Sequence, residues 1–198
     1  EKANGGQCLI AWDAVCKPTC LGGLSVRNLQ MQGLALWVRW EWLRRTDPER
    51  PGQGLPMTED RDARAVFDSL VNISVGEGTK VLFWRDRWIH GFSAKDIAPF
   101  IHSKVETRTV NRRTVADGLE NGRWLLDISG ELGFGDHMQL IHLNLAMCTV
   151  QRDASSQDSF SWPPDSSGLY TARSTYHRLC PGAVTAPYAS CIWKSWAL

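Results

Sequence analysis

The stretch Gly76-Glu77-Gly78-Thr79-Lys80-Val81-Leu82-Phe83-Trp84-Arg85-Asp86-Arg87-Trp88 lies near the middle of a chain of 198 residues. Two glycines precede a run of residues with high strand propensity, and the run ends in Trp-x-Asp-x-Trp. Upstream, residues 71–75 alternate apolar and polar side chains, which is the period of a half-buried strand. Two such runs joined by Gly-x-Gly predict a β-hairpin near residues 71–84.

The tryptophans of this stretch allow two interpretations. Trp84 and Trp88 can fill a core, because a buried tryptophan removes a large area from water. They can also stack on unpaired bases of a nucleic acid. We favour the core role. We expect Asp86, between them, to bond a backbone amide or an arginine, because a lone carboxylate does not make a catalytic site.

The composition is that of an ordinary globular protein, with 43% apolar and 22% charged residues. The net charge is only +1, so no whole-molecule field attracts nucleic acid or a membrane. No apolar run approaches the length of a membrane span, and the polar N-terminus does not resemble a signal peptide. We therefore expect an intracellular protein without a membrane partner, with the nucleus as one compartment that fits. The ends of the sequence are typical of a fragment of a longer chain.

The cysteines do not predict a metal site. The chain has six cysteines, and only Cys16 and Cys20 lie close together in the sequence. A structural zinc site usually needs two such pairs. We expect free thiols, no bound metal and no cofactor.

Residues 27–45 predict an amphipathic helix. Asn28 can cap its N-terminus, and apolar residues recur at helical spacing on one face, which we expect to be buried. The residues of that face are Leu29, Gly33, Leu36, Trp40 and Leu43. The arginines of the helix can contact a phosphate backbone or form the solvated edge of a core helix, and these arginines are Arg39, Arg44 and Arg45.

Further along the chain, residues 60–70 and 172–179 predict short helices. Residues 158–171 predict a second hairpin around a Pro-Pro-Asp-Ser-Ser-Gly turn. Residues 104–113 are the most basic local stretch, which can contact nucleic acid or form a solvated loop. Its basic residues are Lys104, Arg108, Arg112 and Arg113.

These elements predict three segments in an α+β fold that is mainly helical. Residues 1–46 form a connector and a helix rich in Trp and Arg, and residues 47–59 form a linker rich in Pro and Gly. Residues 60–198 form a helical domain, and its two short β-hairpins can share one small sheet. The sequence does not indicate an oligomeric state.

Four ordered blocks carry a family resemblance. The first is Trp-x3-Cys-Lys-Pro-x2-Leu-Gly-Gly from Trp12, and the second is Leu-Ala-Leu-x2-Arg-Trp-x-Trp from Leu34. The third is the central stretch. The fourth runs from Asp158, through Ser-Gly-x-Tyr-Thr-Ala-x-Ser-x-Tyr, to Ile-Trp-Lys-x-Trp at Ile192. Together they resemble the C-terminal part of plant non-LTR (LINE-type) reverse transcriptases, just before the zinc-binding domain. The residues that carry the motifs are Gly22, Gly23, Trp40, Gly76, Gly78, Phe83, Trp84, Asp86, Trp88, Trp162, Tyr170, Tyr176 and Trp193.

The resemblance implies a non-catalytic linking segment. The family's Tyr-x-Asp-Asp polymerase motif does not occur in the sequence, and the zinc ligands of the family would follow Leu198. The implied partners are template RNA or target DNA and the neighbouring reverse-transcriptase and zinc-binding domains. The alternative is a remnant of a decayed retroelement with a scaffold role only. An independent enzyme is poorly supported, because the sequence lacks the signatures of hydrolases, metalloproteases and P-loop proteins.

Overall fold

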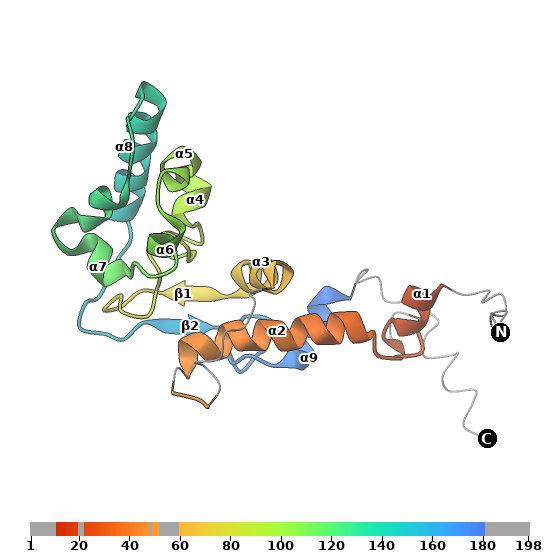
Figure 1. Cartoon of the computed structure of the whole chain (residues 1–198). Coiled ribbons are helices and arrows are strands. Elements are labelled where there is room, and N and C mark those ends of the chain that lie inside the picture. The colour runs from red at the N-terminus through yellow and green to blue at the C-terminus, as the bar shows by residue number, and fades with distance from the viewer. Residues whose placement is uncertain (1–10, 20–21, 48, 52–59, 181–198) are drawn as a thin grey trace, which may run out of the picture.

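The structure is a computed structural model that describes residues 11–19, 22–47, 49–51 and 60–180. In these ranges the chain is mainly helical with one small antiparallel sheet, which confirms the predicted α+β class (Figure 1). The elements are α1 (Trp12–Cys16), α2 (Leu29–Thr46), α3 (Arg61–Leu70), β1 (Asn72–Ser74), α4 (Ala94–Ile97), α5 (Pro99–Ser103), α6 (Thr107–Val110), α7 (Val115–Leu119), the 3₁₀ helix η2 (Glu120–Asp127), α8 (Phe134–Cys148), β2 (Ser159–Ser161) and α9 (Ala172–Leu179).

The sheet differs from the two predicted hairpins. Strand β1 pairs with β2, with Ile73 opposite Phe160, so each predicted hairpin region contributes one strand to a shared sheet. Residues 79–84 form bends and turns with one isolated bridge at Leu82 instead of a strand, and the amides of Gly76, Gly78 and Lys80 bind the carboxylate of Asp158. In the second region the turn closes through a bond from Trp162 N to Gly168 O. The chain then enters α9, whose N-cap is Thr171, without forming a return strand.

Helix α2 forms where it was predicted, but a different face is buried. The Asn28 side chain caps it by accepting hydrogen bonds from the amides of residues 30 and 31. Leu29 and Leu36, which were expected inside, are 80% and 46% exposed. The buried residues are Ala35, Val38, Glu41, Trp42 and Arg45. The predicted face was wrong because two charged residues of the helix are paired in the interior.

Apolar side chains form two clusters. The cluster that we call the Trp84 core contains Phe83, Trp84, Trp88 and Trp124, and α4, α5, α7 and α8 pack around it. The cluster that we call the Trp162 core contains Val38, Trp42, Ala63, Phe67, Val71 and Trp162. Ile73 and Phe160 of the sheet contact both clusters, so the sheet lies at their boundary. Figure 1 shows α4 to α8 on one side of the sheet and α2, α3 and α9 near the other.

Candidate nucleic-acid interface

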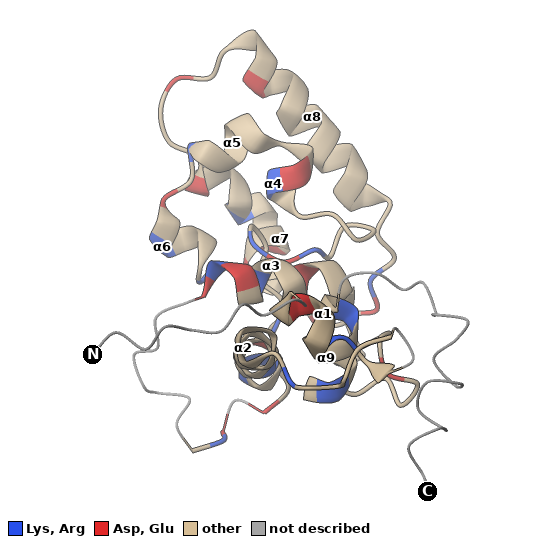
Figure 2. Ribbon diagram, turned by 90° about the vertical axis from the view of Figure 1, so that its right-hand side faces the viewer, with Lys and Arg blue, Asp and Glu red and all other residues tan. Residues whose placement is uncertain are grey.

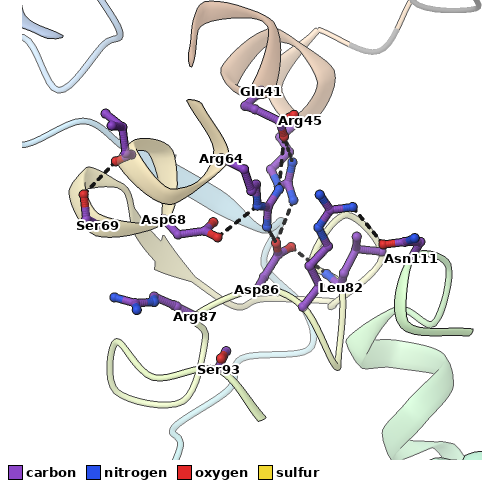
Figure 3. Close-up of polar contacts among 12 residues, drawn as sticks. Glu41, Arg45, Arg64, Asp68, Ser69, Leu82, Asp86, Arg87, Ser93 and Asn111 are labelled. Carbon is purple, nitrogen blue, oxygen red and sulfur yellow. Dashed lines mark hydrogen bonds and ion pairs between the residues drawn. The ribbon is translucent and has the colours of Figure 1, made fainter. Parts of the chain in front are cut away.

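The carboxylate of Asp86 lies at the centre of a buried charge network (Figure 3). Its Oδ1 accepts hydrogen bonds from Nη2 of Arg45 and Nη2 of Arg64, both at 2.6 Å. Its Oδ2 accepts a hydrogen bond from the amide of Leu82 at 2.8 Å. The sequence interpretation offered an amide or an arginine as the partner, and Asp86 has both. With both oxygens engaged and no exposure to solvent, this carboxylate cannot act on a substrate.

Further acidic groups complete the network. Arg64 donates from Nη1 to Glu41 at 3.1 Å and from Nε to Asp68 at 3.0 Å. The guanidinium carbons of Arg45 and Arg64 lie 5.2 and 5.5 Å from the centroid of the Phe67 ring. The network therefore joins α2, α3 and the turn before Asp86 along the edge of the Trp162 core. The network has a structural role, because removing one member of a buried ion pair leaves the other charge uncompensated and destabilises the fold.

The electrostatic environment shifts the pKa values of three groups in the network. Burial opposes ionisation of Asp86, but Arg45 and Arg64 outweigh it and hold the pKa of Asp86 below its usual value. Burial also opposes the charge on Arg64, and the surrounding carboxylates, Asp86 first, overcome it and raise the pKa of Arg64. Burial raises the pKa of Asp68, and Arg64 offsets this effect only in part. Asp86 is therefore the strongly held anion, and Asp68 is a weaker member of the same network.

Asp158 organises the glycines of the central stretch. Its Oδ1 accepts hydrogen bonds from the amides of Gly76 and Gly78, and its Oδ2 accepts one from the amide of Lys80, each at 2.8 Å. A Cβ atom on Gly76 would lie 2.2 Å from the carbonyl oxygen of Ser156, and Gly78 has a φ of +82°. Both motif glycines are therefore required by the backbone that surrounds this carboxylate.

The motif tryptophans of the two cores point inward. Trp84, Trp88 and Trp162 are at most 3% exposed. Each indole N–H donates to an internal acceptor: Trp84 to Asp127 Oδ2, Trp88 to Phe83 O and Trp162 to Ser174 Oγ. These rings cannot stack on bases in this fold, which agrees with the core role.

Two of the other motif residues, Tyr170 and Tyr176, form hydrogen bonds to α2 and its N-cap residue. The hydroxyl of Tyr170 donates to the carbonyl of Ala35 on α2. The hydroxyl of Tyr176 accepts a hydrogen bond from the amide of Asn28 at 3.0 Å. Gly22 and Gly23 lie in the turn between α1 and α2, where a Cβ on Gly23 would lie 2.1 Å from the carbonyl oxygen of residue 17. Trp40 is half-buried on α2, whereas Trp193 and linker residues 52–59 lie outside the described residues.

The basic stretch at residues 104–113 is divided between internal and exposed roles. Lys104 Nζ donates to the carbonyl of Glu131 at 2.6 Å and lies 3.1 Å from an oxygen of Asp136. Arg113 forms an ion pair with Asp127, the acceptor of the Trp84 indole. Arg108 and Arg112 are exposed and line a shallow hollow of about 270 Å³.

The three arginines predicted on α2 are also separated by the fold. Arg39 and Arg44 are exposed, and Arg44 lies 3.7 Å from Glu41. Arg45 is buried in the Asp86 network, and we assign it to that network instead of to a surface that contacts phosphates.

A basic surface that the sequence interpretation missed lies along α9. Two hollows of about 440 and 420 Å³ share Arg173 and His177 in their linings. Arg27 lines the first hollow and Arg178 lines the second. We call Arg27, Arg173, His177 and Arg178 the α9 cationic surface. The sequence of α9, Ala-Arg-Ser-Thr-Tyr-His-Arg-Leu, could have indicated this surface, because it contains two arginines and no acidic residue. Blue segments mark these arginines on α9 in Figure 2.

One carboxylate, Asp165, lines the second hollow. It accepts hydrogen bonds from Ser167 Oγ at 2.7 Å and Thr171 Oγ1 at 2.9 Å. These bonds, with Ser167 first, hold the pKa of Asp165 below its usual value. Asp165 therefore keeps a negative charge in the lining of the second hollow, beside Arg173 and Arg178.

Clustered metal ligands and long apolar helices do not occur in the part of the chain that the structure describes. Among those residues, no group of three or more His, Cys, Asp or Glu side chains is arranged to hold a metal ion. Cys16, Cys148 and Cys180 are free thiols, and Cys20 lies outside the described residues. None of the described helices has the length and apolar character needed to cross a bilayer.

Comparison with known proteins gives one distant similarity. The chain is 24% identical, over 95% of its length, to an Arabidopsis thaliana protein named "Putative ribonuclease H protein". The alignment spans 34% of that relative, so the chain corresponds to about a third of its length. No protein-family model matches the chain, and no solved structure matches it.

Proposed function

We propose that this chain is a non-catalytic linking segment of a LINE-type reverse transcriptase polyprotein and that it contacts single-stranded RNA or DNA through the α9 cationic surface. The observation that carries the proposal is the shared lining of the two hollows, because Arg27 and Arg173 line one hollow and Arg173 and Arg178 line the other. Arginine guanidinium groups match phosphate oxygens in geometry and charge. The distant similarity to a plant protein named for ribonuclease H is compatible with a polyprotein that acts on nucleic acid.

The expected mode of binding is electrostatic. Because Trp84, Trp88 and Trp162 are buried, these rings offer no face to bases. Arg173 and Arg178 lie five residues apart on one short helix, and Arg27 adds a cation from the turn before α2. Binding through such a surface follows the sugar–phosphate backbone, carries little sequence preference and weakens with salt.

The non-catalytic part of the proposal rests on the state of the carboxylates. Asp86 and Asp158 are the buried aspartates of the described interior, and both have their oxygens occupied by internal donors. Metal-dependent nucleic-acid chemistry needs carboxylates that are free to bind cations. A metal-dependent turnover of RNA or DNA by the purified chain would contradict this part.

The test is a titration of the full chain with a fluorescent single-stranded RNA and the matching DNA at two salt concentrations. The double variant Arg173→Gln/Arg178→Gln removes two cations of the α9 surface without touching a core. We expect weaker binding, and we expect the slope of log affinity against log salt to fall by about 1 to 2.

A matched control removes two exposed arginines elsewhere. The variant Arg108→Gln/Arg112→Gln makes the same change in net charge at the shallow hollow beside α6. Binding close to that of the unaltered chain is expected for this control. Equal losses in both double variants would show only an effect of net charge and would refute the assignment to α9.

The second candidate function is a scaffold without nucleic-acid binding, as in a remnant of a decayed retroelement. The near-neutral net charge of +1 favours it. A folded chain, with tryptophan emission at short wavelength and no response to RNA or DNA at low salt, would establish this alternative in place of the binding function.

A further inference from the structure

The first hollow beside α9 has a wall of mixed chemistry. Residues of α1, of the turn before α2, of α2 and of α9 line it, and Figure 2 shows these three helices near one another. Its volume of about 440 Å³ is within the range of small-molecule sites, roughly 300 to 1,000 Å³. Among the described residues no carboxylate lines it, whereas Asp165 lines the second hollow. The first hollow can therefore take an anionic ligand without repulsion from its own wall.

Tyr176 contributes an aromatic ring to this wall. The residue is half-buried on α9, and its hydroxyl accepts a hydrogen bond from the amide of Asn28, which holds the ring in place. Cys16, Pro18 and Ala172 add apolar surface to the same lining. Unlike the indoles of the two cores, this ring is partly exposed. Such a wall suits a flat group, because an aromatic side chain can stack on the face of any base.

Polar side chains of the lining are available to a ligand. Among the described residues, no group bonds to the half-buried side-chain amide of Gln32 or pairs with the guanidinium groups of Arg27 and Arg173. A primary amide both donates and accepts hydrogen bonds, which matches the Watson–Crick edge of an unpaired base. Guanidinium groups match phosphate oxygens. The hollow therefore combines groups that suit a base with groups that suit the phosphates beside it.

The two hollows are continuous along α9. Arg173 and His177 line both of them, and Arg178 lines the second. A strand whose phosphates follow Arg178 and Arg173 therefore passes the first hollow, where one base can turn inward. In a duplex each base is paired and stacked, so a base enters a pocket only at the cost of unstacking. The hollow thus distinguishes single strands from duplexes, which the cations of the surface alone do not do.

We propose that the first hollow receives one unpaired base of a bound nucleic acid, with the base stacked on Tyr176 and its edge hydrogen-bonded to the amide of Gln32. This inference rests on the proposed function and deepens it, because it supplies a physical basis for a preference for single strands. Every base has an aromatic face, so stacking in the hollow carries little sequence preference. The arginines bind the backbone, and Tyr176 and Gln32 bind the base.

The experiment compares two probes that carry the same charge. A fluorescent thymidine oligonucleotide and its abasic analogue, which has the same phosphates and no bases, are each titrated with the full chain at low and at high salt. We expect the thymidine strand to bind at least about fivefold more tightly than the abasic strand, as stacking on an aromatic side chain provides. Equal, salt-dependent binding of both probes would overturn the base pocket and leave the phosphate contacts of the proposed function intact. Binding of neither probe would overturn the proposed function as well.

A pair of matched variants tests the role of Gln32. Gln32→Leu keeps the size and charge of the side chain but removes the amide. We expect it to bind the thymidine strand roughly two- to tenfold more weakly, as for the loss of one hydrogen bond, and to bind the abasic strand unchanged. The control Gln30→Leu makes the same change on the same helix at an exposed position outside the hollow, and it is expected to bind both probes as the unaltered chain does. Equal losses in the two variants would refute the contact to Gln32.

A filling variant tests the hollow itself. Ala172 is the first residue of α9 and lines the hollow, so Ala172→Phe occupies part of its volume without changing the charge. With folding checked by circular dichroism, this variant is expected to bind the abasic strand unchanged and to lose the preference for the thymidine strand. Arg173→Gln/Arg178→Gln is expected to weaken binding of both probes alike. A preference for the thymidine strand that persists in folded Ala172→Phe would place the base elsewhere and overturn the proposal.

Discussion

Trp84 and Asp86 are two residues apart, but their side chains enter different interiors. The Trp84 ring packs among Phe83, Trp88 and Trp124, with ring centroids 5.0 Å from Phe83 and 6.1 Å from Trp124. The Asp86 carboxylate points the other way and binds two arginines from α2 and α3. One short stretch thus serves an apolar core and a charge network at the same time.

The two interiors differ in what they demand of their residues. Apolar burial is non-directional and roughly proportional to area, so a core tolerates moderate changes of shape. A buried charge network fails when one partner is lost, because the other charges are then left without compensation. Trp-x-Asp-x-Trp is therefore one short motif whose tryptophans and aspartate are expected to respond differently to substitution. The predictions below test this division, from the largest expected effect to the smallest.

Replacing Trp84 is expected to destabilise the apolar Trp84 core, with the largest effect of the predictions. Trp84→Ala removes a fully buried ring and its hydrogen bond to Asp127. We expect the free energy of unfolding to fall by about 4 kcal/mol, as for other large-to-small core changes. Urea unfolding monitored by circular dichroism measures it, and Trp84→Phe, which keeps an aromatic ring, should lose clearly less. Equal stability of Trp84→Ala and the unaltered chain would contradict the core role.

Replacing Asp86 is expected to destabilise the buried charge network. Asp86→Asn keeps the shape of the side chain but leaves Arg45 and Arg64 without their shared anion, and we expect a loss of about 3 kcal/mol. The control Glu120→Gln removes an exposed ion pair with Arg123 and should change stability by less than about 1 kcal/mol. The same urea titration compares them. A loss in Asp86→Asn no larger than in the control would mean that the network does not hold the fold.

The pH dependence sharpens the comparison. The pKa of Asp86 is lower in the folded state than in the unfolded state. Its contribution to the free energy of unfolding is therefore fully present above the pKa of the unfolded state, about 4, and is lost as pH falls through the pKa of the folded state. The stability difference between the unaltered chain and Asp86→Asn should therefore be constant from neutral pH down to about 5 and shrink below about 4. Trp84→Ala should show no such convergence. Urea midpoints measured at several pH values test both expectations.

The smallest effect is expected at Asp68. Burial raises the pKa of Asp68, so the folded state disfavours its charged form. The free energy of unfolding is therefore expected to fall as pH rises from the pKa of Asp68 in the unfolded state to its raised pKa in the folded state. Asp68→Asn removes that penalty and one bond to Arg64, and we expect a net change of at most about 1 kcal/mol. A loss as large as that of Asp86→Asn would show that the network has no single central anion.

Local features of the sequence predicted much of the helical structure. Asn28 predicted the start of α2, and the periodicity of residues 60–70 and 172–179 predicted α3 and α9. These features succeed because caps and amphipathic periods depend on neighbours within one or two turns. The candidate surface was harder to predict. Of the seven basic residues named from the sequence, Arg45, Lys104 and Arg113 have internal partners, whereas the cations of α9 were overlooked.

By itself, the sequence determined the positions of α2, α3 and α9, the α+β class and the inward role of Trp84 and Trp88. Only the tertiary structure decided that β1 pairs with β2, that α2 buries Glu41 and Arg45 and that Asp158 binds the amides of Gly76, Gly78 and Lys80. The reason is physical. Propensity and periodicity act over a few residues, whereas strand pairing and buried ion pairs depend on groups that meet only when distant segments fold together.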